Sequence, residues 1–204
     1  MRIAGWAVAL MVLLATPGLA SAAGKDTVTK ESRAKGMADA PALAKAAGSD
    51  CQVADARYVG QAADPKTKVK TSLYEVACAG SEGLLIESVS DQPAPQAFTC
   101  MEAASAAASG NKTANQCILP ANADPKTGLL PFVKKAGVDC TPDRIRAFGH
   151  SSTTAFFELA CHEGAPGYVL ETASPPSLEK PVTAESCLMF DPNTPVHCEL
   201  TDRA

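Results

Sequence analysis

The eight cysteines of this 204-residue chain fall into two sets of four, and no other sequence feature restricts its fold as much. An even number of cysteines at repeated positions in an exported protein is typical of a disulfide framework. A zinc site is not predicted, because the chain contains no Cys-x-x-Cys pair. We therefore predict that all eight form disulfides, in a first set of Cys51, Cys78, Cys100 and Cys117 and a second set of Cys140, Cys161, Cys187 and Cys198.

The residues around the two sets also correspond. The segment Ala47–Cys51 (AGSDC) matches 136–140 (AGVDC), and Arg57 then coincides with Arg146. The strands that end at the second cysteine of each set, LYEVAC and FFELAC, share the pattern Glu-x-Ala-Cys. Ordered matches of this kind predict a tandem duplication of one small disulfide-bonded domain.

Each copy has the same expected order of elements. A short helix, Pro41–Ala47 in the first copy and Leu129–Ala136 in the second, ends at a glycine suited to a left-handed cap. Prolines later interrupt the chain before a helix near the third cysteine, at about 98–109 in the first copy. Between these helices three strands are expected, from the first cysteine to Gly60 or Gly149, up to the second cysteine, and across 84–89 or 168–173. The prediction is an α+β fold in which each domain is a three-stranded antiparallel meander with flanking short helices.

Changes in composition along the chain divide it into five expected parts. Arg2, an apolar stretch and the small residues Ala20 and Ala22 are typical of a secretory signal peptide over 1–22, cleaved near Ala22. The polar residues 23–39 predict a flexible lead-in. The remaining parts are a first repeat domain at 40–119, a linker at 120–127 and a second repeat domain at 128–204.

These features predict a protein outside the cytoplasm. The leader predicts a periplasmic or secreted location, and its alanine-rich cleavage site favours the periplasm. No later stretch has the length of a membrane-spanning helix, so no membrane span is expected in the mature chain. A net charge of −4 without a clustered basic surface argues against a nucleic-acid partner.

Hairpin geometry favours one of the three disulfide pairings that four cysteines allow. Facing residues of an antiparallel hairpin have position numbers with a constant sum, so pairing Cys51 with Cys78 places the turn at 64–65. The second set gives a turn at 150–151, and both segments are turn-like. We therefore expect the first two cysteines of each set to pair, Cys51 with Cys78 and Cys140 with Cys161.

Two arginines do not fit perfect alternation along the first strand of each copy. Arg57 and Arg146 would lie on the same face as the preceding cysteine. A β-bulge or a position at the rim of the sheet would resolve the conflict, and the sequence does not choose between them.

Lysines at the tip of the first hairpin are the candidate partner contacts. Lys66, Lys68 and Lys70 alternate along the chain, so they are expected to project from one face as a small basic surface on an acidic protein. Such a surface suits an anionic polymer or a protein partner. Lysine is also a common protection of an exposed sheet edge.

Other patterns carry weak signals of catalysis, metal binding or modification. Gly149–Thr153 (GHSST) is similar to the Gly-x-Ser-x-Gly turn of hydrolases, but its fifth residue is threonine. His162 and His197 adjoin cysteines, yet oxidised cysteines do not bind metals as thiolates. Asn111–Thr113 fits a glycosylation sequon, which matters only in a eukaryotic host. No catalytic residue, metal or cofactor is therefore predicted.

The favoured hypothesis is a non-catalytic, exported structural or scaffolding protein of the cell envelope that acts through protein–protein contacts. The alternative is a small-ligand binder or an inhibitor of an exported hydrolase, which would use a loop such as the lysine hairpin as its contact. A hydrolase is the weakest hypothesis. Cross-linking in intact cells separates the first two, because a scaffold is recovered in large assemblies and a free inhibitor is not.

Overall fold

The computed structural model describes residues 27–111, 117–162, 166–193 and 197–201. Its described part is an α+β fold with two four-stranded antiparallel sheets, and the strands of each sheet follow one another in chain order. The predicted signal peptide and its cleavage site lie outside the described residues, as does most of the glycosylation sequon.

The first sheet contains β1 (Val53–Ala63), β2 (Lys70–Cys78), β3 (Leu84–Val89) and β4 (Gln96–Thr99). Helix α1 (Lys30–Ala46) precedes this sheet, and helix α2 (Cys100–Ala108) directly follows its last strand.

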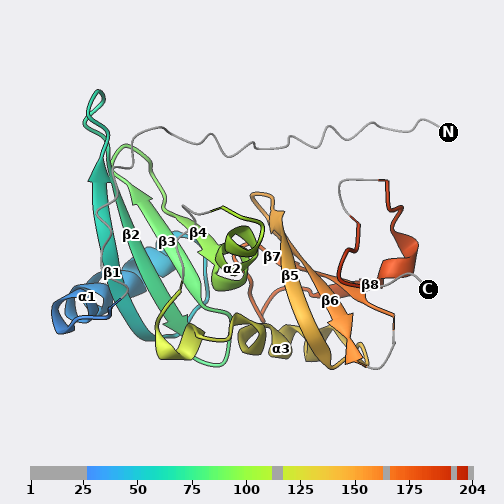
Figure 1. Ribbon diagram of the computed structural model, residues 1–204. Helices are drawn as coiled ribbons and strands as arrows, with labels where there is room; N and C mark the ends of the chain where they lie inside the picture. The colour runs from blue at the N-terminus through green and yellow to red at the C-terminus, as the bar shows by residue number, and fades with distance from the viewer. Residues whose placement is uncertain (1–26, 112–116, 163–165, 194–196, 202–204) are drawn as a thin grey trace.

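The second sheet contains β5 (Pro142–His150), β6 (Thr154–Cys161), β7 (Tyr168–Ala173) and β8 (Thr183–Ser186). It is preceded by the short 3-10 helix η1 (Pro120–Asn122) and by α3 (Pro125–Ala136), and is followed by the single 3-10 turn η3 (Cys187–Met189). Figure 1 shows the first sheet on the left, the second on the right and α2 between them.

The prediction of an α+β fold is confirmed, but the prediction of three strands per meander is incomplete. A fourth strand completes each sheet: β4 pairs with β3 and β8 pairs with β7. Each of these strands has only four residues and follows a proline-rich segment. Strands this short contain too few alternating positions to produce a recognisable pattern.

Helix α1 begins eleven residues earlier than predicted, at Lys30 instead of Pro41. The predicted flexible lead-in is therefore wrong for residues 30–39, which are helical. A capping box between Thr29 and Ser32 satisfies the first backbone amides and sets this start. Pro41, the first residue of the predicted helix, lies inside the observed one.

The two helices α1 and α3 cover the corresponding face of their sheets. Ala40 and Ala44 of α1 pack with Tyr74 and Val76 of β2 in the first hydrophobic core. Larger residues occupy the matching places in the second core, namely Leu129, Phe132 and Val133 of α3 with Phe157 and Leu159 of β6. The small residues of α1 let this helix lie closer to its sheet than bulky residues would permit.

Helix α2 leaves the first sheet and packs on the second. Met101 is 4% exposed and belongs to the second core, together with Phe132 and Phe157. Ser105 Oγ accepts a hydrogen bond from the backbone amide of Ala147 in β5 at 2.8 Å. The second core is therefore completed by a helix that the first half of the chain supplies.

The segment that follows β8 differs from the segment that follows β4. A helix near Cys187 was predicted, but η3 is a single 3-10 turn. Leu188 and Met189 are 68% and 78% exposed, whereas Met101, which also follows the third cysteine of its set, is buried. Cys187 and Phe190 of this segment instead belong to a small third cluster of the second sheet. Its other members are Val169, Cys198, Phe148 and Phe156.

Both predicted hairpins are present, with their turns displaced by two positions. Ala63 faces Lys70, which centres the first turn between 66 and 67. Half of the displacement arises because Val53, and not Cys51, faces Cys78, and the other half comes from register shifts between Val53 and Asp55 and between Tyr58 and Gly60. The first of these shifts also resolves the position of Arg57, because one irregularity changes the face of every residue after it. The second hairpin has two equivalent shifts.

Four disulfides connect all eight cysteines, and both predicted pairings are present. Each closes within its own set of four, at Cys51–Cys78, Cys100–Cys117, Cys140–Cys161 and Cys187–Cys198. The first pair of each set joins the open end of a hairpin. The second pair joins the start of α2 to Cys117, or the start of η3 to Cys198. The chain that follows each of these cysteines binds the face of its sheet opposite α1 or α3.

Candidate functional site

A buried ion pair lies on the face of the first sheet opposite α1. Arg57 on β1 directly faces Glu75 on β2, and Arg57 Nε donates to Glu75 Oε2 at 2.5 Å. Glu75 is fully buried, and the Arg57 side chain is 9% exposed. A buried charge is costly to a fold unless it is paired and hydrogen-bonded, so this pair depends on the rest of its surroundings.

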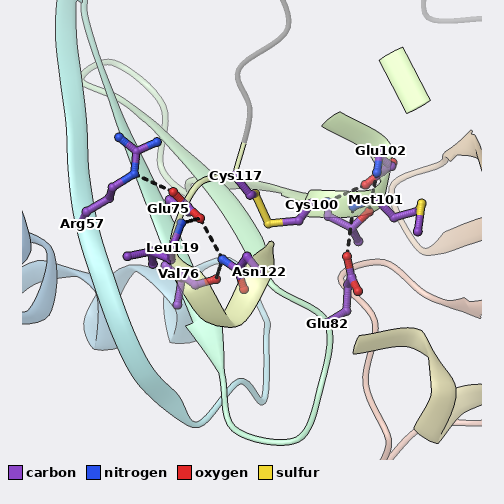
Figure 2. The surroundings of a disulfide bond; sticks show 11 residues. Arg57, Glu75, Val76, Glu82, Cys100, Met101, Glu102, Cys117, Leu119 and Asn122 are labelled. Carbon is purple, nitrogen blue, oxygen red and sulfur yellow. Dashed lines mark hydrogen bonds and ion pairs between the residues drawn. A yellow bond between two sulfur atoms is a disulfide. The ribbon is translucent and has the colours of Figure 1, made fainter. Parts of the chain in front are cut away.

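The second oxygen of Glu75 binds the chain that follows Cys117. Glu75 Oε1 accepts hydrogen bonds from the backbone amide of Leu119 at 2.8 Å and from Asn122 Nδ2 at 3.0 Å. Asn122 also donates to the Val76 carbonyl. Figure 2 shows these groups beside the Cys100–Cys117 disulfide. The first residues of the predicted linker at 120–127 are thus bound to the first sheet.

The second sheet has the same arrangement. Arg146 Nε donates to Glu158 Oε2 at 2.5 Å, and Glu158 is fully buried. Its carboxylate accepts three backbone amides from the chain that follows Cys198, those of Glu199, Leu200 and Thr201. In both sheets the residue two positions after the fourth cysteine donates its amide to the buried glutamate. Both oxygens of each glutamate accept hydrogen bonds, and each glutamate ties the chain that follows the fourth cysteine to its sheet.

The same two glutamates lie close to cysteine sulfurs, an arrangement that could hold a metal ion if the cysteines were reduced. Glu75 lies within 4.8 Å of the sulfurs of Cys100 and Cys117, and Glu158 has the same relation to Cys187 and Cys198. Each pair of cysteines is bonded as a disulfide and offers no thiolate. These clusters are therefore structural.

A third buried carboxyl has no counterpart in the second sheet. Glu82, in the turn between β2 and β3, is 1% exposed, and its Oε1 accepts the backbone amide of Met101 at 2.9 Å. Its other oxygen is buried and has no hydrogen-bond partner. Burial raises the pKa of Glu82 to about 8.

The GHSST segment forms the turn of the second hairpin, as the strand-turn-strand interpretation predicts. His150 Nδ1 lies 2.5 Å from Glu102 Oε1 on α2, and this hydrogen bond raises the pKa of His150. Ser151 Oγ instead contacts the backbone of the same turn, where it accepts the amide of Thr154 at 3.1 Å. His150 thus joins α2 to the second hairpin, and its described contacts do not activate Ser151.

Within the described residues, neither histidine beside a cysteine belongs to a cluster that could hold a metal ion. His162 Nδ1 lies 2.9 Å from Asp143 Oδ2, and His197 Nε2 lies 3.5 Å from Glu199 Oε1. Each contact is with a nearby carboxylate, at the surface or partly exposed.

The predicted partner contacts lie at the tip of the first hairpin. Lys66 and Lys68 are in the turn and Lys70 begins β2, and all three are exposed. They do not alternate along one strand as expected, because the displaced turn separates them. Asp64 Oδ1 accepts the backbone amides of Thr67 and Lys66, which lowers the pKa of Asp64. The carboxylate thus shapes the turn that carries the lysines.

Sequence reasoning missed the buried glutamates. Both lie in the Glu-x-Ala-Cys pattern, between apolar residues of a strand, and an acidic residue repeated in such a place indicates a bonded buried charge. Glu82 had no such signal, since its burial depends on how α2 and α3 pack.

No protein-family model, curated protein or solved structure matches this chain. In the described part of the chain, no helix is both long enough and apolar enough to cross a membrane. The four disulfides are typical of a protein that folds in an oxidising compartment.

Proposed function

We propose that this protein is a non-catalytic, exported structural or scaffolding component of the cell envelope, located in the periplasm, and that it acts by binding other proteins. In this proposal the chain is a tandem duplication of one small domain. The repeated arginine–glutamate pair, with its amide donors two residues after the fourth cysteine, supports the duplication.

The observation that carries the proposal is the tip of the first hairpin. Figure 1 shows it projecting beyond the rest of the first sheet. Lys66, Lys68 and Lys70 are exposed there, and the one carboxylate of the turn, Asp64, is already bound to backbone amides. The tip therefore presents three cations on a rigid support within a chain of net charge −4. Loops held by a rigid scaffold are common sites of protein contact.

The buried carboxylates support a non-catalytic function. Glu75 and Glu158 are occupied by arginine and backbone amides, and His150 is occupied by Glu102. A catalytic acid or base needs an atom that can reach a substrate. In the described part of the chain these groups instead join one segment to another.

The test replaces the three tip lysines by glutamine in the full chain, within cells that export it. A control variant carries the same charge change at three exposed helix lysines, Lys30, Lys45 and Lys134. We expect the tip variant to lose the partners that are cross-linked to the wild-type protein, and the control to retain them. Because exposed charges act mainly through association rate, the wild-type contact should weaken as salt is raised.

Two results would contradict the proposal. The first is a tip variant that keeps every cross-linked partner. The second is a hydrolytic activity of the purified protein that is lost in Ser151→Ala. A protein that runs as a free monomer until a purified exported hydrolase is added would instead support the inhibitor hypothesis.

A further inference from the structure

Glu82 lies where three parts of the chain meet. Its own turn belongs to the first sheet, and its Oε1 accepts the backbone amide of Met101 at the start of α2. Gly128, in the first turn of α3, packs against its other oxygen, because a Cβ on Gly128 would lie 2.5 Å from Glu82 Oε2. Figure 2 shows Glu82 directed toward the start of α2.

These contacts place the carboxyl at the joint between the two sheets. Met101 donates its amide to Glu82 while its side chain is buried in the second core. A glycine is required at position 128 because any side chain there would meet Glu82. The second half has Pro166 at the place that corresponds to Glu82, so this carboxyl is a property of the joint and not of each copy.

The charged groups around Glu82 do not compensate a negative charge. Glu102 on α2 and Asp124 at the N-terminal cap of α3 are both acidic and oppose its ionisation. Lys126, in the same turn as Gly128, directs its amine to the Asp143 carbonyl at 3.5 Å. Asn122 from η1 is neutral. Within the described residues no donor reaches Glu82 Oε2, so only the Met101 amide stabilises the ionised form.

We propose that Glu82 makes the joint between the two sheets sensitive to pH: the neutral carboxyl keeps α2 and α3 packed together, and the ionised carboxyl loosens them. A buried charge without a partner costs far more than a neutral carboxyl in the same place. Loosening lets water reach the charge, at the expense of the contact between α2 and α3.

The direction of the effect follows from the raised pKa. Burial raises the pKa of Glu82 from 4.5 to about 8. The stabilising effect of the bound proton is fully present below 4.5, declines as the pH rises from 4.5 to about 8, and is absent above about 8. The joint should therefore be closed in mildly acidic surroundings and looser in alkaline ones.

The test compares Glu82→Gln with the control Glu171→Gln, which changes an exposed glutamate on β7. Amide hydrogen exchange of the full chain is measured from pH 6 to pH 9, with the intrinsic exchange rate divided out. In the wild type and the control, protection at the start of α2 and α3 should fall about a hundredfold between pH 6 and pH 9, tenfold for each pH unit up to the raised pKa of about 8. In Glu82→Gln it should stay constant.

A second measurement uses the unmodified protein, so that it does not depend on the folding of a variant. The side-chain carboxyl carbon of Glu82 is followed by NMR, and its midpoint should lie above pH 7. A midpoint near 4.5 would overturn the proposal. So would an unchanged pH effect in Glu82→Gln, because that result would assign the effect to another group, such as the His150–Glu102 pair.

Discussion

Gly36 of α1 packs directly on the backbone of Arg57, so closely that a Cβ at position 36 would lie 2.5 Å from the Arg57 Cα atom. The helix therefore presses on the strand that carries one member of the buried ion pair. Gly36→Ala should destabilise the protein by about 1–3 kcal/mol, because backbone on both sides must move. Urea unfolding measures this loss, and Gly60→Ala, where nothing lies within 4 Å of the added Cβ, is the tolerated control.

The two buried glutamates should differ in how much their charge matters. Glu75→Gln leaves Arg57 buried without its carboxylate, which should cost about 3–5 kcal/mol. Glu158→Gln should cost less, because the Arg146 side chain is 22% exposed against 9% for Arg57, and solvent screens more of its charge. Denaturant unfolding of the two variants tests the order. Equal losses would show that exposure of the arginine does not set the cost.

Met101 should contribute to the stability of both halves. Met101→Ala removes a buried side chain from the second core, with an expected loss of about 2–5 kcal/mol. Met189→Ala, at a residue that is 78% exposed, should change stability by less than about 0.5 kcal/mol. The two variants are compared by thermal unfolding, and a second half that melts unchanged in Met101→Ala would contradict the shared core.

The contact between His150 and Glu102 should add stability on the acidic side of neutrality. The hydrogen bond to Glu102 raises the pKa of His150 above its ordinary 6.5. Its stabilising effect is therefore fully present below 6.5 and is lost as the pH rises through the raised value. His150→Gln should lose this part of the pH dependence, as read from melting temperatures. His162→Gln, at an exposed histidine, is the control.

Local patterns predicted the repeated parts of the fold well. Leu84–Val89 and Tyr168–Ala173 are strands as expected, and hairpin arithmetic selected Cys51–Cys78 and Cys140–Cys161. These features depend on turns, alternation and spacing within a short stretch of chain. The exact registers were not predicted, because a bulge leaves no reliable mark in a sequence.

What was missed depends on contacts between distant segments. The start of α1 is set by a cap at Thr29, within a stretch too polar to suggest a packed helix. The position of α2 depends on the apolar face that the second sheet offers to Met101. The carboxyl of Glu82 is buried only because α2 and α3 meet over it. Nothing in the local sequence of any of these residues specifies its distant partner.

The amides that bind Glu158 come from Glu199 to Thr201, whereas those that complete Glu75 come from Leu119 and Asn122. During synthesis the last hydrogen-bond donor to Glu75 is therefore made about 80 residues before the last donor to Glu158. This is an interval of about 4 to 16 seconds at ordinary translation rates. Met101 has no core to enter until the strands that carry Phe157, Leu159 and Leu170 have been made, about 50 residues after Asn122. The emerging chain therefore exposes the Met101 side of α2 while every donor to Glu75 is already in place, so the order of synthesis leaves this side of the helix uncovered until the second sheet forms.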